Sequence, residues 1–492
     1  MSLREKVVHG LLWSLASRVG GQAFQFAFGV VLARLLSPNE FGTIGMLLVF
    51  TGFAQALADC GLSAALIQIQ VVTERDCSTV FWLQFAIALC LCGLLWVSAP
   101  AIAAFYALPA IEMPCRLMSG IFPLQALGYT HSSLLSKQFQ FRALAIISVV
   151  SIATSGIAAV ALAAYGFGIW ALVWQSMVAA LVTTALLWMR SHWRPSFLFD
   201  REAAVKLSRY GIYLLGHGSL NYWIRNGDNL LIGKFLGAHS LGIYARAYSL
   251  MLLPLNNIGA VLGQVMFPAL SQVQHDIPRF RKSYLTATRV IALISFPIMI
   301  GIAVLAEPFI AVLYGEKWAE VYPLLQVLSL VGLFQSIIFP VGWIFTSLGK
   351  TKAQFLLSVP LAFMFIIAII WGIRYGLIGV TYAYAIWTLW AGVLNLHLAG
   401  KYIGLTASNI LMSVVPIGLM SGAMGLVVFM VDAFLLKTYL PAIQLLASGA
   451  LGGLIYLTLC IITKDETFVE LLLLISTKID HDLVPARLKS IP

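Results

Sequence analysis

Residues 78–103 read STVFWLQFAIALCLCGLLWVSAPAIA and contain no Asp, Glu, Lys or Arg in 26 positions. A helix of about 20 apolar residues is long enough to cross the hydrocarbon core of a bilayer. The stretch therefore predicts a transmembrane helix, and the question is how far this pattern extends along the chain.

The composition of the whole chain points the same way. Of its 492 residues, 61% are hydrophobic and 10% are charged, and the mean hydropathy is +0.93. Soluble domains carry about 25% charged residues, so this composition excludes a soluble protein. The net charge of +11 does not indicate nucleic-acid binding, because the basic residues lie in short loops between apolar runs, as in loops that face anionic lipid.

Further apolar stretches predict an all-α polytopic membrane protein with about 14 transmembrane helices. Their boundaries are 9–33, 43–66, 78–103, 113–135, 143–165, 168–189, 210–235, 242–268, 286–314, 322–347, 354–374, 378–398, 410–432 and 438–462. With the N-terminus in the cytoplasm, the inner segments up to residue 409 hold sixteen Lys and Arg residues and the outer segments hold six. This bias predicts that both termini are cytoplasmic.

An internal repeat predicts two pseudo-symmetric lobes of six helices each. The segment ARLLSPNEFG at 33–42 aligns without gaps with GKFLGAHSLG at 233–242. Parallel repeats of this kind place the substrate of a transporter between the lobes. We therefore expect lobes at 1–190 and 210–400. A cytoplasmic amphipathic linker is expected at 191–209, where Asp200 caps a short helix, followed by two additional transmembrane helices at 401–463 and a cytoplasmic tail at 464–492.

Polar side chains form a stripe on the first predicted span. Arg18, Gln22 and Gln25 lie on one helical face because they are spaced by four and three residues. Charges inside a membrane are costly and need a protein or water neighbour. We therefore predict that this face lines a hydrated substrate-binding cavity. The alternative is that these residues only join helices together.

The seventh predicted span carries a matching stripe. Arg225 lies four residues after Asn221, and Asp228 lies three residues after Arg225. The repeat offset of 200 residues aligns positions 21 and 25 of the first span with positions 221 and 225 of the seventh. Arginine binds phosphate through a planar fork that stays charged, so the stripes predict an anionic substrate. Asp228 is a candidate ion-coupling residue, or else it pairs with Arg225. Asp59, on the second span, is a second candidate for ion coupling, or it pairs with Arg18.

Several segments resemble the polysaccharide-transporter branch of the multidrug/oligosaccharidyl-lipid/polysaccharide exporter superfamily, in particular Wzx-type flippases for colanic acid and lipopolysaccharide. They are HGLLWS at 9–14, LARLLSPNEFG at 32–42, FDRE at 199–202, LSRYG at 207–211, FPALS at 267–271, LYGEKW at 313–318 and SLGK at 347–350. The resemblance implies two lobes that rock between inward-open and outward-open states.

The same resemblance implies a function. The expected substrate is an undecaprenyl-diphosphate-linked oligosaccharide in the bacterial inner membrane, with coupling to Na⁺ or H⁺, no metal site and no further cofactor. A polysaccharide polymerase and export machinery would be its partners besides membrane lipids. By position the family's first-span arginine matches Arg18, and its seventh-span acidic residue matches Asp228. The twelfth span departs from the family pattern, because Thr381 and Asn395 are not acidic.

Three alternatives to a flippase are open, and the paired polar stripes at matching repeat positions argue against one of them, a non-transporting scaffold or lipid-binding protein. A cation-coupled multidrug exporter of the same superfamily would be expected to carry more acidic residues in its cavity. A membrane enzyme, such as an O-antigen polymerase or ligase, needs a long outer loop with His and Arg, and the outer loops predicted here are too short. We therefore expect a transporter and no catalytic residues.

Overall fold

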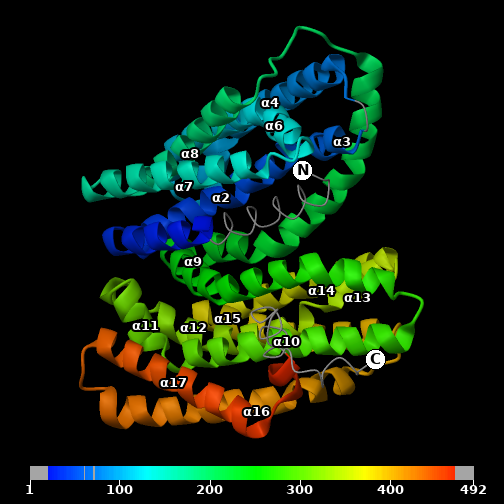
Figure 1. Cartoon of the computed structure of the whole chain (residues 1–492). Coiled ribbons are helices and arrows are strands. Elements are labelled where there is room, and N and C mark those ends of the chain that lie inside the picture. The colour runs from blue at the N-terminus through cyan, green and yellow to red at the C-terminus, as the bar shows by residue number, and fades with distance from the viewer. Residues whose placement is uncertain (1–19, 60, 70–71, 471–492) are drawn as a thin grey trace, which may run out of the picture. The chain divides into compact units, whose positions relative to one another are not determined.

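The computed structural model describes residues 20–59, 61–69 and 72–470. In these residues the secondary structure is helical and contains no strand (Figure 1). The chain divides into two compact units, Met1–Ala245 and Arg246–Pro492. The division falls inside a helix and not at the predicted linker, so the lobe boundaries at 190 and 210 remain predictions.

The first unit is built from antiparallel helices joined by short loops. A helix covers residues 20–35. It is followed by α2 (Pro38–Ala58), α3 (Leu62–Gln68), α4 (Glu74–Tyr106), α5 (Glu112–Ser119), α6 (Ile121–Lys137), α7 (Phe141–Ala164), α8 (Ile169–Arg190) and the first part of α9 (Arg201–Gln272). A 3₁₀ turn at Pro109–Ile111 precedes α5.

The start of α2 shows why the sequence folds as it does locally. Ser37 is the N-cap and Pro38 is the first helical residue. Glu40 completes a capping box: the Ser37 N–H donates to the Glu40 carboxylate at 2.7 Å, and the Glu40 N–H donates to the Ser37 hydroxyl oxygen at 3.4 Å. Such a box satisfies backbone N–H groups that would otherwise lack partners. The repeated sequence segment is thus a helix start.

The second unit contains the rest of α9 and eight further α-helices. These are α10 (Ile277–Val304), α11 (Ala306–Leu313), α12 (Val321–Ile338), α13 (Val341–Ser347), α14 (Thr351–Ile373), α15 (Gly376–Lys401), α16 (Ala407–Val431) and α17 (Pro441–Thr463). A 3₁₀ turn, Glu316–Trp318, and a π-helical turn, Asp432–Leu436, complete it. Helices α16 and α17 pack against each other and lie next to each other in Figure 1.

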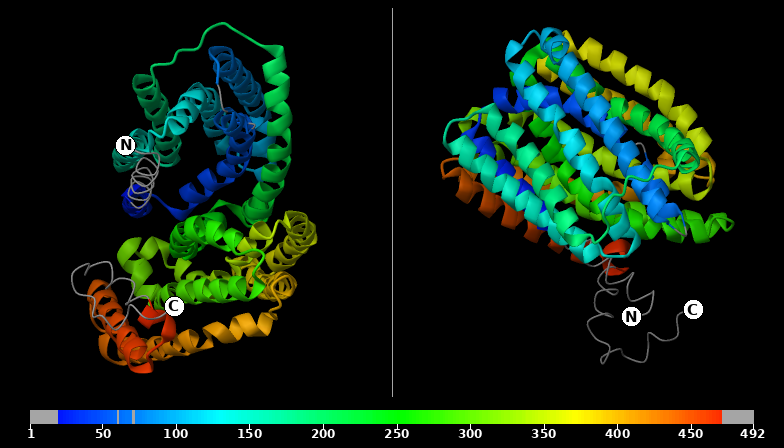
Figure 2. Two further views of the ribbon diagram at one scale, coloured as in Figure 1. Left: turned by 45° about the vertical axis from the view of Figure 1, so that its right-hand side comes forward. Right: turned by 90° about the horizontal axis from the view of Figure 1, so that it is seen from above.

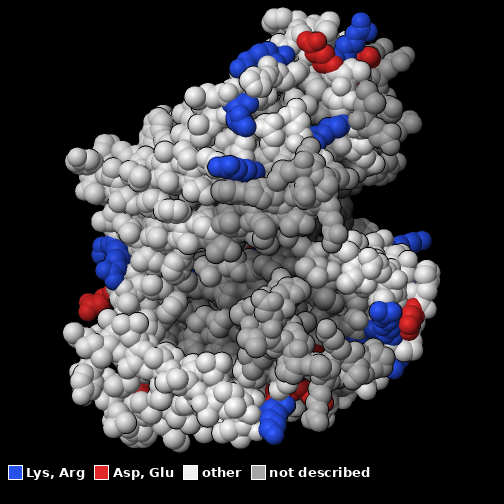
Figure 3. Space-filling model, viewed as in Figure 1, with Lys and Arg blue, Asp and Glu red and all other residues white. Residues whose placement is uncertain are grey.

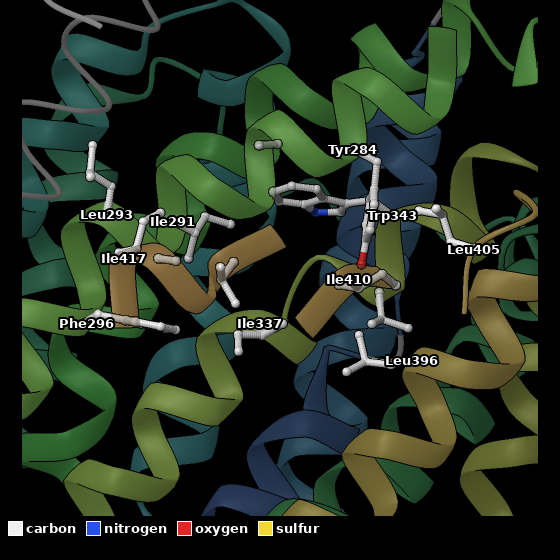
Figure 4. Close-up of a cluster of buried hydrophobic side chains, with 14 of the residues drawn as sticks. Tyr284, Ile291, Leu293, Phe296, Ile337, Trp343, Leu396, Leu405, Ile410 and Ile417 are labelled. Atoms are coloured by element: carbon white, nitrogen blue, oxygen red, sulfur yellow. The ribbon is translucent and has the colours of Figure 1, made fainter. Parts of the chain in front are cut away.

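A large apolar core holds the second unit together (Figure 4). Ile291 and Phe296 of α10 are 2% and 3% exposed and lie in one cluster with Ile417 of α16. The hydroxyl of Tyr456 on α17 donates to the Leu293 carbonyl at 2.8 Å. The two predicted additional helices therefore pack directly against α10.

Nine helices in the described part of the chain are long and apolar enough to cross a membrane. They correspond to the third, fifth, sixth and ninth to fourteenth predicted spans, which are thereby confirmed. A bent pair in α9, Arg225–Gly259 and Leu262–Gln272, raises the number to at most ten. Most of the face in Figure 3 carries no charged side chain, as expected for a surface that meets lipid.

The total of fourteen is not confirmed, and the remaining predicted spans show why. The first begins outside the described residues. The second is divided between α2 and α3, and the fourth is divided at Gly120 between α5 and α6. The seventh and eighth lie within α9, which bends at Gly237, where φ is 85°. Glycine adopts this backbone conformation without a steric penalty.

The predicted linker has a different structure from the one expected. Residues 191–200 are extended and pack on α4: the Asp200 N–H donates to Thr79 Oγ1 at 2.9 Å, and the ring of Phe197 stacks on Trp82 at 5.3 Å. The short helix that we expected to end near Arg209 is instead the first part of α9. Figure 2 shows the extended segment joining α8 to α9.

Candidate functional site

Asp59 lies at the centre of a hydrogen-bond network that joins three helices. Its Oδ1 accepts from the Ser63 N–H at 3.3 Å, from the Ser63 hydroxyl, and from Gln84 Nε2 at 2.9 Å. Gln84 Oε1 in turn accepts from the Thr130 hydroxyl at 3.2 Å. Gln84 on α4 and Thr130 on α6 are fully buried. We call these four residues the Asp59 network.

The chain forms this network because the second span is broken at Asp59. Helix α2 ends at Ala58, and Gly61 has a φ of 66° before α3 begins. The first N–H groups of α3 have no carbonyl acceptor within their own helix. The Asp59 carboxylate accepts a hydrogen bond from one of them, the Ser63 N–H. No ion pair joins Asp59 to a Lys or Arg among the residues with described side chains. The predicted partner, Arg18, lies outside the described residues.

A pocket of about 290 Å³ lies one helical turn before Asp59. We call it the Gln125 pocket. It is lined by Gln55 of α2, by residues of α6 and by residues of α8: Gln125, Gly128, Tyr129, Ser132, Ala179, Ala180, Thr183, Thr184 and Leu187. The wall of the pocket thus combines uncharged amide and hydroxyl groups with small and aliphatic side chains.

Hydrogen bonds hold the wall of the pocket in place. Gln125 Oε1 accepts from Gln55 Nε2 at 2.5 Å and from the Tyr129 hydroxyl at 3.3 Å. The Thr184 hydroxyl donates to the Leu124 carbonyl at 2.8 Å, and Thr183 donates to Ser151 of α7 at 2.9 Å. The pocket is therefore fixed by contacts among four helices.

The predicted polar stripe of the first span is described only in part. The side chain of Gln22 is half-buried, and its Oε1 is buried without a hydrogen-bond partner among the described residues. Gln25 is exposed. Nearby, Phe28 packs on α7, where a Cβ at Gly156 would come within 2.4 Å of its ring. The role of this stripe remains a prediction.

The predicted polar stripe on α9 does not contain the ion pair between Arg225 and Asp228 that was one of its two interpretations. Asp228 is 3% exposed, and its carboxylate accepts from the Tyr244 hydroxyl at 3.1 Å and from the Asn229 N–H at 2.8 Å. Arg225 is exposed, and no ion pair links it to Asp228. The side chain of Asn221 lies outside the described ones. Tyr244 reaches Asp228 because the chain bends at Gly237.

The two copies of the sequence repeat meet in space. A Cβ added at Gly42 would lie 1.6 Å from the Ala238 carbonyl oxygen, and one added at Gly242 would lie 2.0 Å from the Pro38 carbonyl oxygen. Residues 38 and 238 are also equivalent in the repeat. The contact is thus reciprocal, as a pseudo-two-fold axis between the copies requires. We call it the glycine contact.

Neighbouring residues extend the glycine contact along α2. The Tyr222 hydroxyl donates to the Val49 carbonyl at 2.8 Å, and the ring of Phe53 lies 5.1 Å from that of Trp223. Sequence reasoning found the repeat but not that its two copies touch. The signal in the sequence that could have indicated this contact is that both copies carry a glycine at the same repeat position, Gly42 and Gly242.

Sequence reasoning also missed an ion-pair cluster in the second unit. Arg289 lies 3.0 Å from Asp465 and 3.2 Å from Glu466. Asp465 is 7% exposed and also accepts from the Thr467 N–H at 3.0 Å. The cluster attaches the segment after α17 to α10.

Metal ligation finds no support in the described part of the chain. No group of three or more His, Cys, Asp or Glu side chains gathers there in a way that could hold a metal ion. The five cysteines with described side chains are free. The two carboxylates in the membrane-crossing part of the first unit, Asp59 and Asp228, are each held by uncharged donors.

Comparison with known proteins places the chain among proteins of polysaccharide synthesis. A family model described as "Polysaccharide biosynthesis protein" matches residues 31–323. The teichuronic acid biosynthesis protein TuaB of Bacillus subtilis (strain 168) is 29% identical over 476 residues, which cover 96% of this chain and 98% of TuaB. The succinoglycan biosynthesis transport protein ExoT of Rhizobium meliloti (strain 1021) is 33% identical over 66% of each chain.

A solved structure shares the fold. The lipid II flippase MurJ in an inward closed conformation superimposes with a TM-score of 0.73 at 18% identity, covering 93% of this chain and 99% of that one. At this identity the likeness concerns the fold. It agrees with the predicted architecture of a polytopic helical transporter.

Proposed function

Because this chain belongs to the polysaccharide biosynthesis protein family, we propose that it is a flippase for undecaprenyl-diphosphate-linked oligosaccharide. It would move exopolysaccharide, O-antigen or colanic-acid-like repeat units across the bacterial inner membrane by alternating access. Both termini would lie in the cytoplasm. The chain itself is a multi-pass membrane protein.

One observation carries this proposal: a relative at 33% identity, ExoT, is a transport protein of polysaccharide biosynthesis. The fold shared with a lipid II flippase supports the same conclusion, since lipid II is also a lipid-linked glycan. The near-absence of charge on the membrane-crossing helices fits a protein that works within the bilayer. The function of a membrane enzyme receives no such support.

The substrate's diphosphate is proposed to bind arginine. Arg225 is exposed on α9 and is not neutralised by Asp228, so its guanidinium is available to an anion. Its planar fork can donate two hydrogen bonds to one phosphate. Arg18, Gln22 and Asn221 are proposed to complete the contact from the aligned stripes.

Coupling to Na⁺ or H⁺ is proposed at the two carboxylates. Half-buried Asp59 is held by uncharged donors. So is Asp228, which is 3% exposed, and a buried ionised carboxylate without a cationic partner is costly. Binding of a proton or Na⁺ would remove that cost. Transport by Asp228→Asn should then lose its dependence on a pH or Na⁺ gradient, and an unchanged dependence at normal rate would make Asp228 a structural residue.

The function can be tested with the purified full-length protein in proteoliposomes. The vesicles receive lipid-linked oligosaccharide extracted from producing cells, with a fluorophore on its glycan. Dithionite, added outside, bleaches only glycans on the outer leaflet. We expect the protected fraction to become accessible in vesicles with the protein and to stay protected in protein-free vesicles.

The same vesicles distinguish the alternative. Protein-dependent efflux of a cationic dye, without movement of the glycan, would favour the cation-coupled multidrug exporter. A polysaccharide polymerase and export machinery are the proposed partners besides membrane lipids, because a translocated repeat unit must be consumed on the outer side. Copurification of the protein with such a polymerase from crosslinked membranes would test this.

A further inference from the structure

We infer that the Gln125 pocket is a subsite for one uncharged sugar ring of the transported oligosaccharide. The inference rests on the proposed function, because it assigns part of that substrate to a place in the first unit. It concerns the glycan and not the diphosphate or the lipid. The pocket's residues were not among those that the sequence pointed to.

The lining of the pocket matches a neutral polyol. No Asp, Glu, Lys, Arg or His lines it, so the pocket carries no formal charge to match that of a phosphate or a cation. Its polar groups are amides and hydroxyls, which both donate and accept hydrogen bonds. Sugar hydroxyl groups have the same dual character, and the aliphatic part of the lining suits the C–H faces of a pyranose ring.

The hydrogen bonds already present leave capacity for a ligand. Gln125 Oε1 accepts from both Gln55 and Tyr129, which leaves the Gln125 Nε2 group as a donor. The Ser132 hydroxyl also lines the pocket. A donor amide and a hydroxyl thus line one small cavity on the same helix.

Small residues provide the space for the ring. Gly128 of α6 lets α8 approach, since a Cβ there would lie 3.0 Å from Leu187 and 3.4 Å from Thr184. Ala179 and Ala180 leave room on the facing helix. Pockets for drug-sized ligands measure about 300–1,000 Å³, so about 290 Å³ is enough for one ring but not for an oligosaccharide.

The position of the pocket agrees with a hydrated route. Gln55 is exposed, and it lies at the middle of the predicted second span, 43–66. An exposed amide at that depth is costly against hydrocarbon. The Gln55 end of the pocket is therefore expected to meet water and the polar head of a substrate.

A substitution that fills the pocket tests the inference. Ala179→Leu places a larger side chain in the cavity, and Ala185→Leu is the matched control, because Ala185 is exposed on the same helix and does not line the pocket. We expect Ala179→Leu to slow the movement of lipid-linked oligosaccharide by about tenfold, as expected when several hydrogen bonds are displaced. Undecaprenyl diphosphate with a single sugar should move at the wild-type rate, and Ala185→Leu should behave as wild type.

Two results would decide against the subsite, and a third would decide against the proposed function. Equal slowing of both substrates by Ala179→Leu would show that the pocket serves the lipid or the fold. Wild-type rates with both would show that it is not occupied. Failure of the wild-type protein to move any lipid-linked glycan would instead contradict the proposed function, so the two failures are distinguishable.

A binding measurement that needs no transport complements this test. In Ser132→Cys, thiol labelling of the peptide that contains residue 132 is followed by mass spectrometry on the solubilised full-length protein. Free glycan, released from the extracted lipid carrier by mild acid, should reduce this labelling, while labelling of the exposed Cys90 stays constant. Protection by undecaprenyl phosphate but not by free glycan would overturn the inference.

Discussion

The two ends of α2 are held by opposite means. At its start, Gly42 meets the backbone of α9 without any side chain between them. At its end, Asp59 is held by the side chains of Ser63 and Gln84. The first contact depends on the absence of atoms, and the second depends on particular polar atoms.

This difference teaches what each end can tolerate. A contact between two backbone segments cannot adjust to an added methyl group, because neither segment can move unless its whole helix moves. A side-chain network can lose one hydrogen bond and keep the others. We therefore expect the start of α2 to be sensitive to any substitution and its end to be sensitive to chemistry.

The largest effect is expected at the glycine contact. Gly42→Ala should destabilise the protein by about 3 kcal/mol, the upper end for overpacking, because the new Cβ would lie 1.6 Å from the Ala238 oxygen. Gly242→Ala should have an effect of similar size. The free energy of unfolding in detergent measures both.

A matched control separates the clash from helix propensity. Gly93 lies within α4, and a Cβ there would meet nothing within 4 Å. Gly93→Ala should therefore stabilise the protein by up to about 1 kcal/mol. If Gly42→Ala is as stable as Gly93→Ala, the glycine contact does not form.

A smaller effect is expected at the Asp59 network. Asp59→Ala leaves the buried Gln84 amide with the Ser63 hydroxyl as its remaining acceptor, which should cost about 1–3 kcal/mol. Asp59→Asn keeps a carbonyl acceptor and should cost less. Denaturant titration of the two variants gives the comparison, and equal stability of Asp59→Ala and wild type would show that the network does not contribute to folding.

The hydrogen bond between Tyr244 and Asp228 is expected to contribute about 1 kcal/mol, as a typical buried hydrogen bond does. Tyr244→Phe removes it without changing the ring. In an Asp228→Asn background the same substitution should cost less, because the two residues are coupled. Additive effects in this double-mutant cycle would mean that the pair does not interact.

The smallest effect on stability is expected at Arg225. Its side chain is exposed, so Arg225→Gln should change the free energy of unfolding by less than about 0.5 kcal/mol. Transport of lipid-linked oligosaccharide should nevertheless be lost. Arg374→Gln, also exposed, should retain both stability and transport. Normal transport by Arg225→Gln would remove this arginine from the proposed binding site.

The sequence by itself determined the class of the protein and much of its architecture. Hydropathy found nine spans that the structure confirms, including residues 78–103, which lie within α4. This succeeds because each membrane-crossing helix must satisfy its own backbone and meet lipid with apolar side chains. The repeat was also visible, because both copies keep a glycine at positions 42 and 242.

The tertiary structure alone decided which polar groups meet. Sequence spacing proposed Arg225 as the partner of Asp228, but the bend at Gly237 brings Tyr244 to it. The Gln125 pocket likewise joins α2, α6 and α8, whose lining residues are spread from position 55 to position 187. Hydropathy is a property of each segment, whereas a hydrogen bond or a cavity depends on how distant segments pack, and that packing has no local signature in the sequence.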